Sequence, residues 1–183
     1  SFFIANYSRM EVTILQVQLT QKERMLLEDM KSEEELCIMK YQSYAQQAKD
    51  PALQQMFNQI AGAEQKHFDT INQILQGNQP NVGQGQGGQT GGQTGAQTGQ
   101  GKQPTGQINL SQAQQVNNNS SDKYLLQDLL STEKHVSSAY DTSIFECTKP
   151  NIRQALQHIQ QEEQNHGEQL FQYMNSHGMY QLQ

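Results

Sequence analysis

The chain has 183 residues, a formal net charge of −6 and a pI near 5.3. That length is enough for one domain with a sizeable core. Because the chain is acidic and has no basic stripe, we expect no nucleic-acid partner. Its apolar runs are far shorter than the ~20 residues of a membrane-spanning helix, so we expect no membrane span.

The N-terminal residues 1–20 are predicted to form an extension that carries a β-strand. The opening SFFIANYSRM lacks the charged start and long apolar stretch of a secretory signal, so none is expected. Residues 11–19, EVTILQVQL, alternate and contain β-branched side chains, which predicts the strand. Because an unpaired strand invites pairing with another chain, residues 11–19 are predicted to join copies of the protein into a filament or lattice.

Two helical hairpins are predicted in the rest of the chain. Their helices span residues 22–48, 52–75, 123–148 and 151–175. Pro51 and Pro150 divide the two pairs, because proline suits the first turn of a helix and disfavours helix just before it. The predicted organisation is one hairpin at residues 21–76, a linker at residues 77–121 and a second hairpin at residues 122–183, with the hairpins forming one domain.

The linker is rich in Gly, Gln, Asn and Thr and contains a loose GGQTG repeat. Such a segment buries too little apolar surface to offset its ordering entropy, so we expect a flexible connection. A ferritin-like four-helix bundle needs one long crossover between its second and third helices. The predicted fold is therefore all-α: a ferritin-like four-helix bundle made of two duplicated hairpins, with an extra N-terminal strand and a Gly/Gln-rich crossover.

The two hairpins are copies of each other. A shift of 99 positions aligns residues 26–75 with residues 125–174 without a gap and gives thirteen identical pairs. These are Leu26/Leu125, Leu27/Leu126, Asp29/Asp128, Ser32/Ser131, Glu34/Glu133, Tyr41/Tyr140, Pro51/Pro150, Gln55/Gln154, Ile60/Ile159, Glu64/Glu163, Gln65/Gln164, His67/His166 and Gln73/Gln172. Shared helix composition would not readily place both prolines and all the Glu and His pairs at one offset, so we infer an internal duplication.

Every predicted helix carries ionisable residues in the middle of its apolar face, which is found by stepping three and four residues along the helix. In chain order they are Glu34, then Glu64 and His67, then Glu133, then Glu163 and His166. Ionised carboxylates in an apolar interior are strongly disfavoured unless they are paired or bind metal. No Lys or Arg lies on these faces to pair with them.

Two divalent cations would neutralise four such carboxylates. One Glu from each of two helices, with Glu-x-x-His from each of the other two, is the ligand pattern of di-iron and di-manganese carboxylate bundles. Oxygen-rich ligation with two imidazoles suits iron or manganese better than structural zinc. The predicted cofactors are therefore two divalent Fe or Mn ions. The alternative is a vestigial site with protonated, hydrogen-bonded carboxyls.

Tyr41 and Tyr140 follow Glu34 and Glu133 by two helical turns on the same face. A phenol in that place is predicted to hydrogen-bond a ligating carboxylate, and the alternative is an ordinary core tyrosine. Only two cysteines occur, Cys37 and Cys147, which suggests synthesis in a reducing compartment, and Cys37 is interpreted as a small buried hydrophobe. The residues predicted to lie on the surface are His135, His158, His177, Glu33, Glu35, Glu162 and Glu168.

The ligand pattern and the Tyr two turns after the first Glu resemble the ferritin-like superfamily, including rubrerythrins and manganese catalases. More narrowly, LLEDMKSEEELCIMKYQSYAQQAKDP, LLSTEKHVSSAYDTSIFE and FQYMNSHGMY resemble the spore coat protein F family of endospore-forming bacteria. The resemblance covers roughly residues 20–76 and 122–180. It implies synthesis in the mother-cell cytoplasm and deposition on the spore surface or coat, with other coat proteins as partners.

Two functions are compatible with these features. The preferred interpretation is a self-assembling structural protein of the spore coat or spore surface, built on a bundle with a dinuclear metal site. The alternative is a dimetal oxidoreductase of catalase or ferroxidase type, since two metals held close together can bind both oxygen atoms of a small substrate. Whether the protein is an enzyme stays open at this point.

Overall fold

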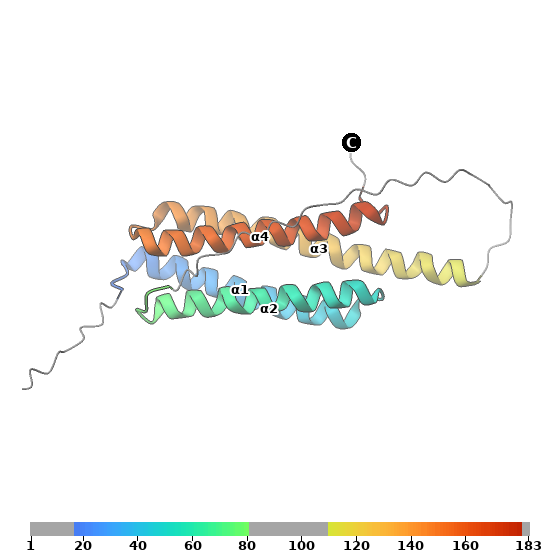
Figure 1. Cartoon of the computed structure of the whole chain (residues 1–183), viewed down its shortest axis with the longest axis horizontal. Helices are drawn as coiled ribbons and strands as arrows, with labels where there is room; N and C mark the ends of the chain where they lie inside the picture. Colours follow the sequence, from blue (N-terminus) through green and yellow to red (C-terminus); the bar gives the residue numbers. More distant parts are fainter. Residues whose placement is uncertain (1–16, 81–109, 181–183) are drawn as a thin grey trace, which may run out of the picture.

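The structure, a computed structural model, describes the backbone of residues 17–80 and 110–180, and the side chains of all of these except residues 110–119. It consists of four α-helices (Figure 1), which are α1 (Gln21–Gln47), α2 (Pro51–Leu75), α3 (Leu110–Glu146) and α4 (Pro150–Ser176). No strand occurs within these ranges. Over these ranges, the prediction of an all-α fold with two helical hairpins is confirmed.

Local sequence sets the ends of the helices. Thr20 caps α1 through a capping box: its hydroxyl accepts from the Glu23 N–H at 3.1 Å, and the Glu23 carboxylate accepts from the Thr20 N–H at 2.7 Å. Pro51 and Pro150 occupy the first turns of α2 and α4, where a missing N–H costs no helical hydrogen bond. Gly178, at φ 66°, follows the end of α4 in the left-handed conformation that glycine adopts most easily.

The third helix is longer than predicted. It begins at Leu110 rather than at residue 123, so the C-terminal part of the predicted linker is helical. Residues 110–121 contain neither glycine nor proline, and several of them are good helix formers, which explains the extension. The predicted flexible segment between residues 81 and 109 lies outside the described residues.

The predicted N-terminal strand is wrong for the part that the structure describes. Residues 17–20 have no regular secondary structure, and residues 11–16 lie outside the described range. The Val17 N–H donates to the carbonyl of Gly77 at 2.8 Å, and the Val17 side chain is buried in the core of its own chain. Leu19 packs against the same core. Val17 and Leu19 therefore pack within their own bundle. Pairing with another copy stays a prediction for residues 11–16.

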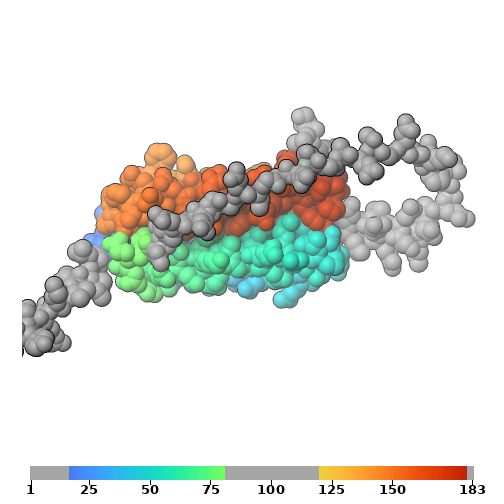
Figure 2. Space-filling model, viewed as in Figure 1, coloured from blue at the N-terminus to red at the C-terminus, as the bar shows by residue number. Residues whose placement is uncertain are grey.

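The two hairpins lie side by side to form a four-helix bundle. α1 contacts α2 and α3, and α4 contacts α3 and α2. α1 and α2 are antiparallel, α3 and α4 are antiparallel, and α2 and α3 run in the same direction (Figure 1). The space-filling view shows α2 and α4 closely apposed along one face (Figure 2). Parallel α2 and α3 need a connection that spans the length of the bundle, in agreement with the long crossover read from the sequence.

The apolar core falls into two clusters at opposite ends of the bundle. One contains Leu27 and Met30 from α1 with Leu156 and Ile159 from α4. The other contains Phe57 and Ile60 from α2, together with Leu126, Leu129 and Leu170 from α3 and α4. Between these clusters lies a layer of buried Glu and His side chains.

Two buried carboxylates tie each hairpin to the turn of the other. Glu23 in α1 accepts from the N–H and the hydroxyl of Thr148, at 2.8 and 2.7 Å, in the turn between α3 and α4. Asp122 in α3 accepts from the N–H groups of Lys49 and Asp50, at 2.8 and 3.0 Å, in the turn between α1 and α2. Burial alone would raise the pKa of Glu23, but the bonds from Thr20 and Thr148 outweigh burial and lower it to about 2.

Candidate metal centre

All six predicted ligands meet in the polar layer at the middle of the bundle. Each is almost fully buried, with at most 5% of its surface exposed, although carboxylates are rarely buried without partners. Their order along the helices explains the convergence: the Glu of α1 and α3 face the Glu-x-x-His pairs of α2 and α4. The residues are Glu34, Glu64, His67, Glu133, Glu163 and His166.

The six residues form two overlapping groups that could each hold a metal ion. The first is Glu34, Glu64, His67 and Glu163, and the second is Glu64, Glu133, Glu163 and His166. Within each group, one ligand atom from every residue lies within 4.8 Å of the others. Glu64 and Glu163 belong to both groups, as expected of carboxylates that bridge two ions. Each of the other four residues belongs to one group.

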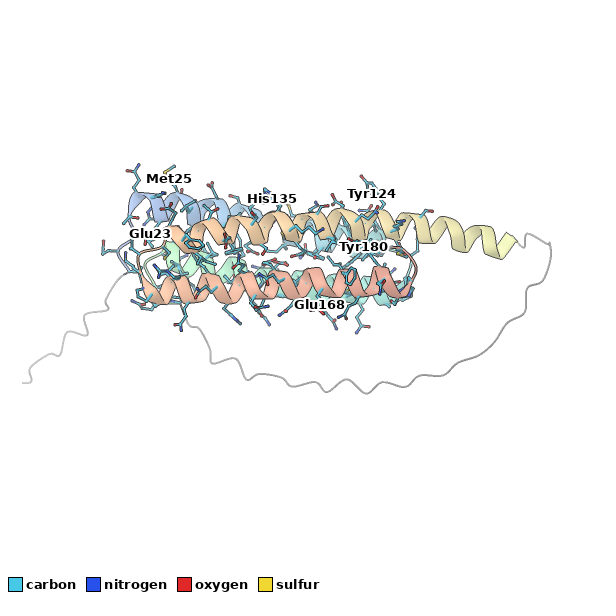
Figure 3. The ribbon with its side chains drawn as sticks, turned by 90° about the horizontal axis from the view of Figure 1, so that it is seen from above. Glu23, Met25, Tyr124, His135, Glu168 and Tyr180 are labelled. Atoms are coloured by element: carbon cyan, nitrogen blue, oxygen red, sulfur yellow. The ribbon has the colours of Figure 1, made fainter. Side chains whose placement is uncertain are left out.

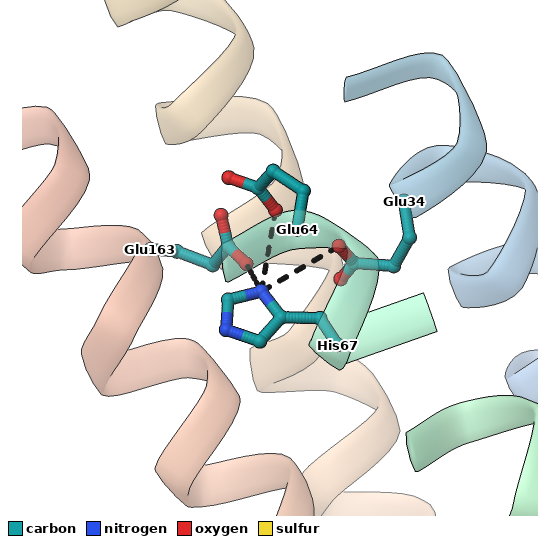
Figure 4. A group of neighbouring side chains, drawn as sticks. All are labelled: Glu34, Glu64, His67 and Glu163. Carbon is teal, nitrogen blue, oxygen red and sulfur yellow. Dashed lines mark hydrogen bonds and ion pairs between the residues drawn. The ribbon is translucent and has the colours of Figure 1, made fainter. Parts of the chain in front are cut away.

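Three carboxylates converge on one nitrogen of His67 (Figure 4). Its Nδ1 lies 2.8 Å from Glu163 Oε1, 3.2 Å from Glu64 Oε2 and 3.6 Å from Glu34 Oε2. A single N–H proton can satisfy only one of these oxygens well. The arrangement therefore concentrates more acceptor atoms than the available protons can serve.

The second group shows the same imbalance. His166 Nδ1 lies 2.9 Å from Glu64 Oε1 and 3.8 Å from Glu163 Oε2, but the short contact lacks the alignment of a hydrogen bond. The buried atoms without a hydrogen-bond partner in this layer are Glu34 Oε2, Glu64 Oε1, Glu133 Oε2, both carboxylate oxygens of Glu163 and His166 Nδ1. Unsatisfied buried polar atoms are rare in native proteins. Lone pairs that converge without protons between them fit divalent cations, so the residues present suit the predicted ions.

Burial and mutual repulsion divide the four carboxyl groups into two kinds. Burial, with the charges of Glu163 and Glu64, raises the pKa of Glu34 to about 8 and that of Glu133 to about 11. Burial also opposes ionisation of Glu64 and Glu163, but their contacts with the two imidazoles outweigh it. These contacts lower the pKa of Glu64, and lower the pKa of Glu163 to about 2. Without metal, the two shared carboxylates carry the negative charge.

The two imidazoles carry the compensating positive charge. Burial would lower their pKa values, but contacts with carboxylates raise the pKa of His67 well above its ordinary value and that of His166 to about 9. Two ionised carboxylates and two imidazolium groups sum to zero. Two divalent cations with four carboxylates and two neutral imidazoles also sum to zero. The layer can therefore exchange protons for metal without leaving a buried net charge.

Both tyrosines hydrogen-bond carboxylates of the opposite hairpin. The Tyr41 hydroxyl on α1 donates to Glu133 Oε1 on α3, and the Tyr140 hydroxyl on α3 donates to Glu34 Oε1 on α1. Both phenols are fully buried, and burial followed by the neighbouring carboxylates raises their pKa values well above the ordinary range. They remain protonated donors that leave the second oxygen of each carboxylate free for a metal.

Glu162 was predicted as part of a solvated face; its side chain is half-exposed, but it also contacts a candidate ligand. Its Oε2 lies 2.9 Å from His67 Nε2 and 3.5 Å from His158 Nε2, so its half-exposed side chain orients the His67 ring from outside the layer. The duplication could not have revealed this role, because the matching position in the first hairpin is Ala63. Only the packing of α4 beside α2 brings Glu162 to His67.

Most of the other residues that were predicted to lie on the surface are exposed. His135, His158, His177, Glu35 and Glu168 are exposed, and Figure 3 shows His135 and Glu168 directed outward. Glu33 is half-buried, and its Oε1 lies 3.5 Å from His135 Nε2. Cys37 is fully buried, and burial raises the pKa of its thiol, so it is an inert core side chain rather than a thiolate ligand.

A pocket that the sequence did not predict opens beside the second group. Its volume is about 490 Å³, and it lies between α3 and α4. Its lining consists of Leu130, Glu133, Lys134, Ser137, Ser138, Asp141, Gln160, Glu163, Gln164 and Gly167. Two of the candidate ligands, Glu133 and Glu163, therefore border a space that is open to solvent.

A model of the Coat F domain family matches residues 121–183, which comprise most of α3, all of α4 and the chain end. Residues 121–183 are therefore similar to the Coat F domain. The resemblance to the spore coat protein F family is thereby confirmed, and the Coat F domain supports a spore coat protein. It supplies Glu133, Glu163 and His166, while the first hairpin, outside the match, supplies the remaining three candidate ligands.

No curated protein and no solved structure matches the chain. Within the part of the chain that the structure describes, no helix is both long and apolar enough to cross a membrane. The segment similar to the Coat F domain includes most of α3 and all of α4, the two helices that border the pocket beside the second ligand group.

Proposed function

We propose that this protein is a structural component of the spore coat or spore surface whose ferritin-like bundle binds two divalent metal ions, iron or manganese. The observation that carries the metal proposal is the polar layer, in which buried carboxylate and imidazole atoms converge without hydrogen-bond partners. The parallel α2 and α3, which require one long crossover, support the ferritin-like topology. Synthesis in the mother cell follows from the coat assignment.

Glu34 and His67 would hold the first ion, Glu133 and His166 the second, and Glu64 and Glu163 would bridge the two. When bound, such a pair supplies Lewis acidity and, for iron or manganese, a redox couple. Tyr41 and Tyr140 would fix the orientation of the outer carboxylates. Each tyrosine hydrogen-bonds an outer carboxylate of the opposite hairpin. Metal binding to these carboxylates would therefore also hold the two hairpins together.

The metal proposal is tested by elemental mass spectrometry of protein purified without chelators. About two Fe or Mn per chain are expected in the wild type. Replacement of a shared ligand, in Glu64→Gln or Glu163→Gln, should remove nearly all metal, whereas Glu34→Gln or Glu133→Gln should remove about half. Glu168→Gln, an exposed change on α4, is the matched control. A wild-type protein without stoichiometric metal would leave only the structural role.

Self-assembly is supported by large apolar side chains on the surface of the bundle. Phe145 is 81% exposed and Tyr124 69% exposed on α3, and Met25 and Met39 are more than half exposed on α1. Figure 3 shows Met25 and Tyr124 directed away from the core. Isolated side chains of this kind are ordinary, but several on two neighbouring helices favour a contact between copies. Residues 11–16 would add a second contact.

The oligomeric mass measured by light scattering over a range of concentrations tests this point. The wild type should form oligomers, and Phe145→Asp combined with Tyr124→Asp should lower the mass. Gln127→Asp, which introduces the same acidic side chain at another exposed position of α3, should leave it unchanged. A wild type that stays monomeric at every concentration would contradict self-assembly.

A second candidate function is a dimetal oxidoreductase, and the pocket beside Glu133 and Glu163 is the observation that favours it. Catalysis needs solvent access to the metals, which a purely structural staple does not. Dismutation of hydrogen peroxide to water and dioxygen, and oxidation of Fe²⁺ by dioxygen, are the two reactions to assay on metal-loaded protein. Activity that disappears in His166→Ala would establish the enzyme; loaded protein inactive in both assays would exclude these two reactions.

A further inference from the structure

Two residues that line the pocket between α3 and α4 differ in size from their equivalents in the first hairpin, although the hairpins are copies. The shift of 99 positions places Ile38 at the position of Ser137, and Phe68 at the position of Gly167. Ile38 is buried, and Phe68 is half-buried beneath Lys31, whose Nζ lies 5.1 Å from the centre of the ring. In α1 and α2, these two positions therefore hold large apolar side chains. In α3 and α4, the same positions hold small residues.

The fold does not require glycine at Gly167. It lies inside α4, without the positive φ that distinguishes Gly77 and Gly178. A Cβ added there would meet Glu133 Cβ at 3.7 Å and Leu130 Cδ1 at 3.8 Å, which are ordinary contacts. Glycine is disfavoured in a helix interior, so its presence has a cost without a packing reason. What it provides is open space beside the Glu163-x-x-His166 segment.

The chemistry of the pocket favours uncharged polar occupants. Serine hydroxyls and glutamine amides supply half of its polar side chains, at Ser137, Ser138, Gln160 and Gln164. Its two exposed charged residues, Lys134 and Asp141, have opposite signs and cancel. A path built to attract metal cations would carry an excess of carboxylates at its mouth.

The floor of the pocket is where the candidate metal layer begins. Glu133 and Glu163 both line it, and both are almost completely buried. Glu133 Oε2 and both oxygens of Glu163 have no hydrogen-bond partner. A molecule in the pocket would therefore lie next to two side chains of the second ligand group.

We propose that the α3–α4 pocket is a one-sided access site, through which small uncharged polar molecules reach the ion held by Glu64, Glu133, Glu163 and His166, while Ile38 and Phe68 close the equivalent path to the first ion. The inference rests on the metal centre proposed above. It assigns Gly167 and Ser137 as the residues that keep the path open, and it makes the two metal positions unequal in their exposure to solvent molecules.

The test introduces residues of the first hairpin at the equivalent positions of the second. Water is the probe molecule. Gly167→Phe and Ser137→Ile copy Phe68 and Ile38 into the pocket, whose volume accommodates them. Each variant and the wild type are loaded with Mn²⁺, and bound Mn is counted by elemental analysis. Water-proton relaxation then reports how freely water reaches the bound ion. Gly62→Phe, the same change at an exposed glycine of α2 with open space around it, is the matched control.

The expected result is an unchanged Mn content in every variant, with loss of most of the relaxation enhancement in Gly167→Phe and Ser137→Ile but not in Gly62→Phe. Equal Mn content with equal relaxation in all four proteins overturns the access role and leaves the metal centre standing. A wild type that takes up neither Mn nor Fe fails the metal proposal, and the access role falls with it. If Gly167→Phe does not fold, Ser137→Ile decides the question alone.

Discussion

The two hairpins present the same ionisable groups to the centre of the bundle but surround them differently. Glu162 contacts the outer nitrogen of His67 in the first hairpin. The position equivalent to Glu162 is Ala63, whose methyl group offers His166 no such partner. Ser137 and Gly167 line a pocket in the second hairpin, whereas Ile38 and Phe68 occupy the equivalent positions of the first. The groups kept in both copies form the candidate metal layer, whereas the residues that diverged lie around it, beside His67 and along the pocket.

The largest expected effect concerns the two buried carboxylates that link the hairpins. The fall in the pKa of Glu23 from 4.5 to about 2 corresponds to about 3 kcal/mol of stability. Glu23→Gln should therefore lower the free energy of unfolding by about that amount at neutral pH. Asp122→Asn should also destabilise the protein, because Asp122 accepts two backbone N–H groups. Urea unfolding measures both.

The sign of the pH dependence follows from the depressed pKa of Glu23. A carboxylate with a lowered folded-state pKa stabilises the protein above its unfolded-state value and loses that effect as protons bind. The difference between wild type and Glu23→Gln should therefore shrink as the pH falls from about 4.5 to about 2. A difference that stays constant over this range would show that Glu23 stabilises the turn without its charge.

The reciprocal tyrosine bonds provide a test of symmetry. Tyr41→Phe and Tyr140→Phe should each destabilise the metal-free protein by about 1–3 kcal/mol, because each leaves a buried carboxyl oxygen without its donor. The two effects should be similar, since both hydroxyls bond the equivalent Glu of the other hairpin. Tyr44→Phe, which removes a bond to the more exposed Asp128, is the comparison variant. A large difference between Tyr41 and Tyr140 would break the symmetry.

The single support of His67 provides a test of asymmetry. Glu162→Gln should weaken metal binding at the first position about 10–100-fold, the usual effect of losing a carboxylate that orients a ligating histidine. Affinity at the second position should hardly change. Ala63→Glu is the converse variant, because it offers His166 the partner that its copy has, and it should strengthen the second position. Competition titrations with a chelator of known affinity distinguish the two positions.

The smallest expected effect compares the two helix-interior glycines. Gly167→Ala and Gly62→Ala should each stabilise the protein by about 0.5–1 kcal/mol through helix propensity. Neither added methyl meets a contact shorter than 3.7 Å. Thermal unfolding measures both changes. If Gly167→Ala destabilised the protein while Gly62→Ala did not, close packing rather than an open pocket would explain the glycine at residue 167.

Much of the fold could be predicted because its determinants are local. The prolines and the apolar periodicity gave the helices near Pro51 and Pro150 to within one or two residues. The start of α3 was placed too late, because residues 110–121 look compositionally like the linker but lack the glycine and proline that interrupt helices. The predicted strand failed over residues 17–19, since alternating residues there serve as a packing segment against the core.

The chain sequence by itself determined which residues enter the polar layer. Helical periodicity assigns Glu34, Glu64 and His67 to interior faces, and the duplication repeats that assignment at Glu133, Glu163 and His166. Tertiary structure alone decided what surrounds them: the crossing of Tyr41 and Tyr140 to opposite hairpins, the support of His67 by Glu162, and the pocket at Gly167. Periodicity fixes the direction of a side chain relative to its own helix, whereas its neighbours on other helices depend on how the helices pack.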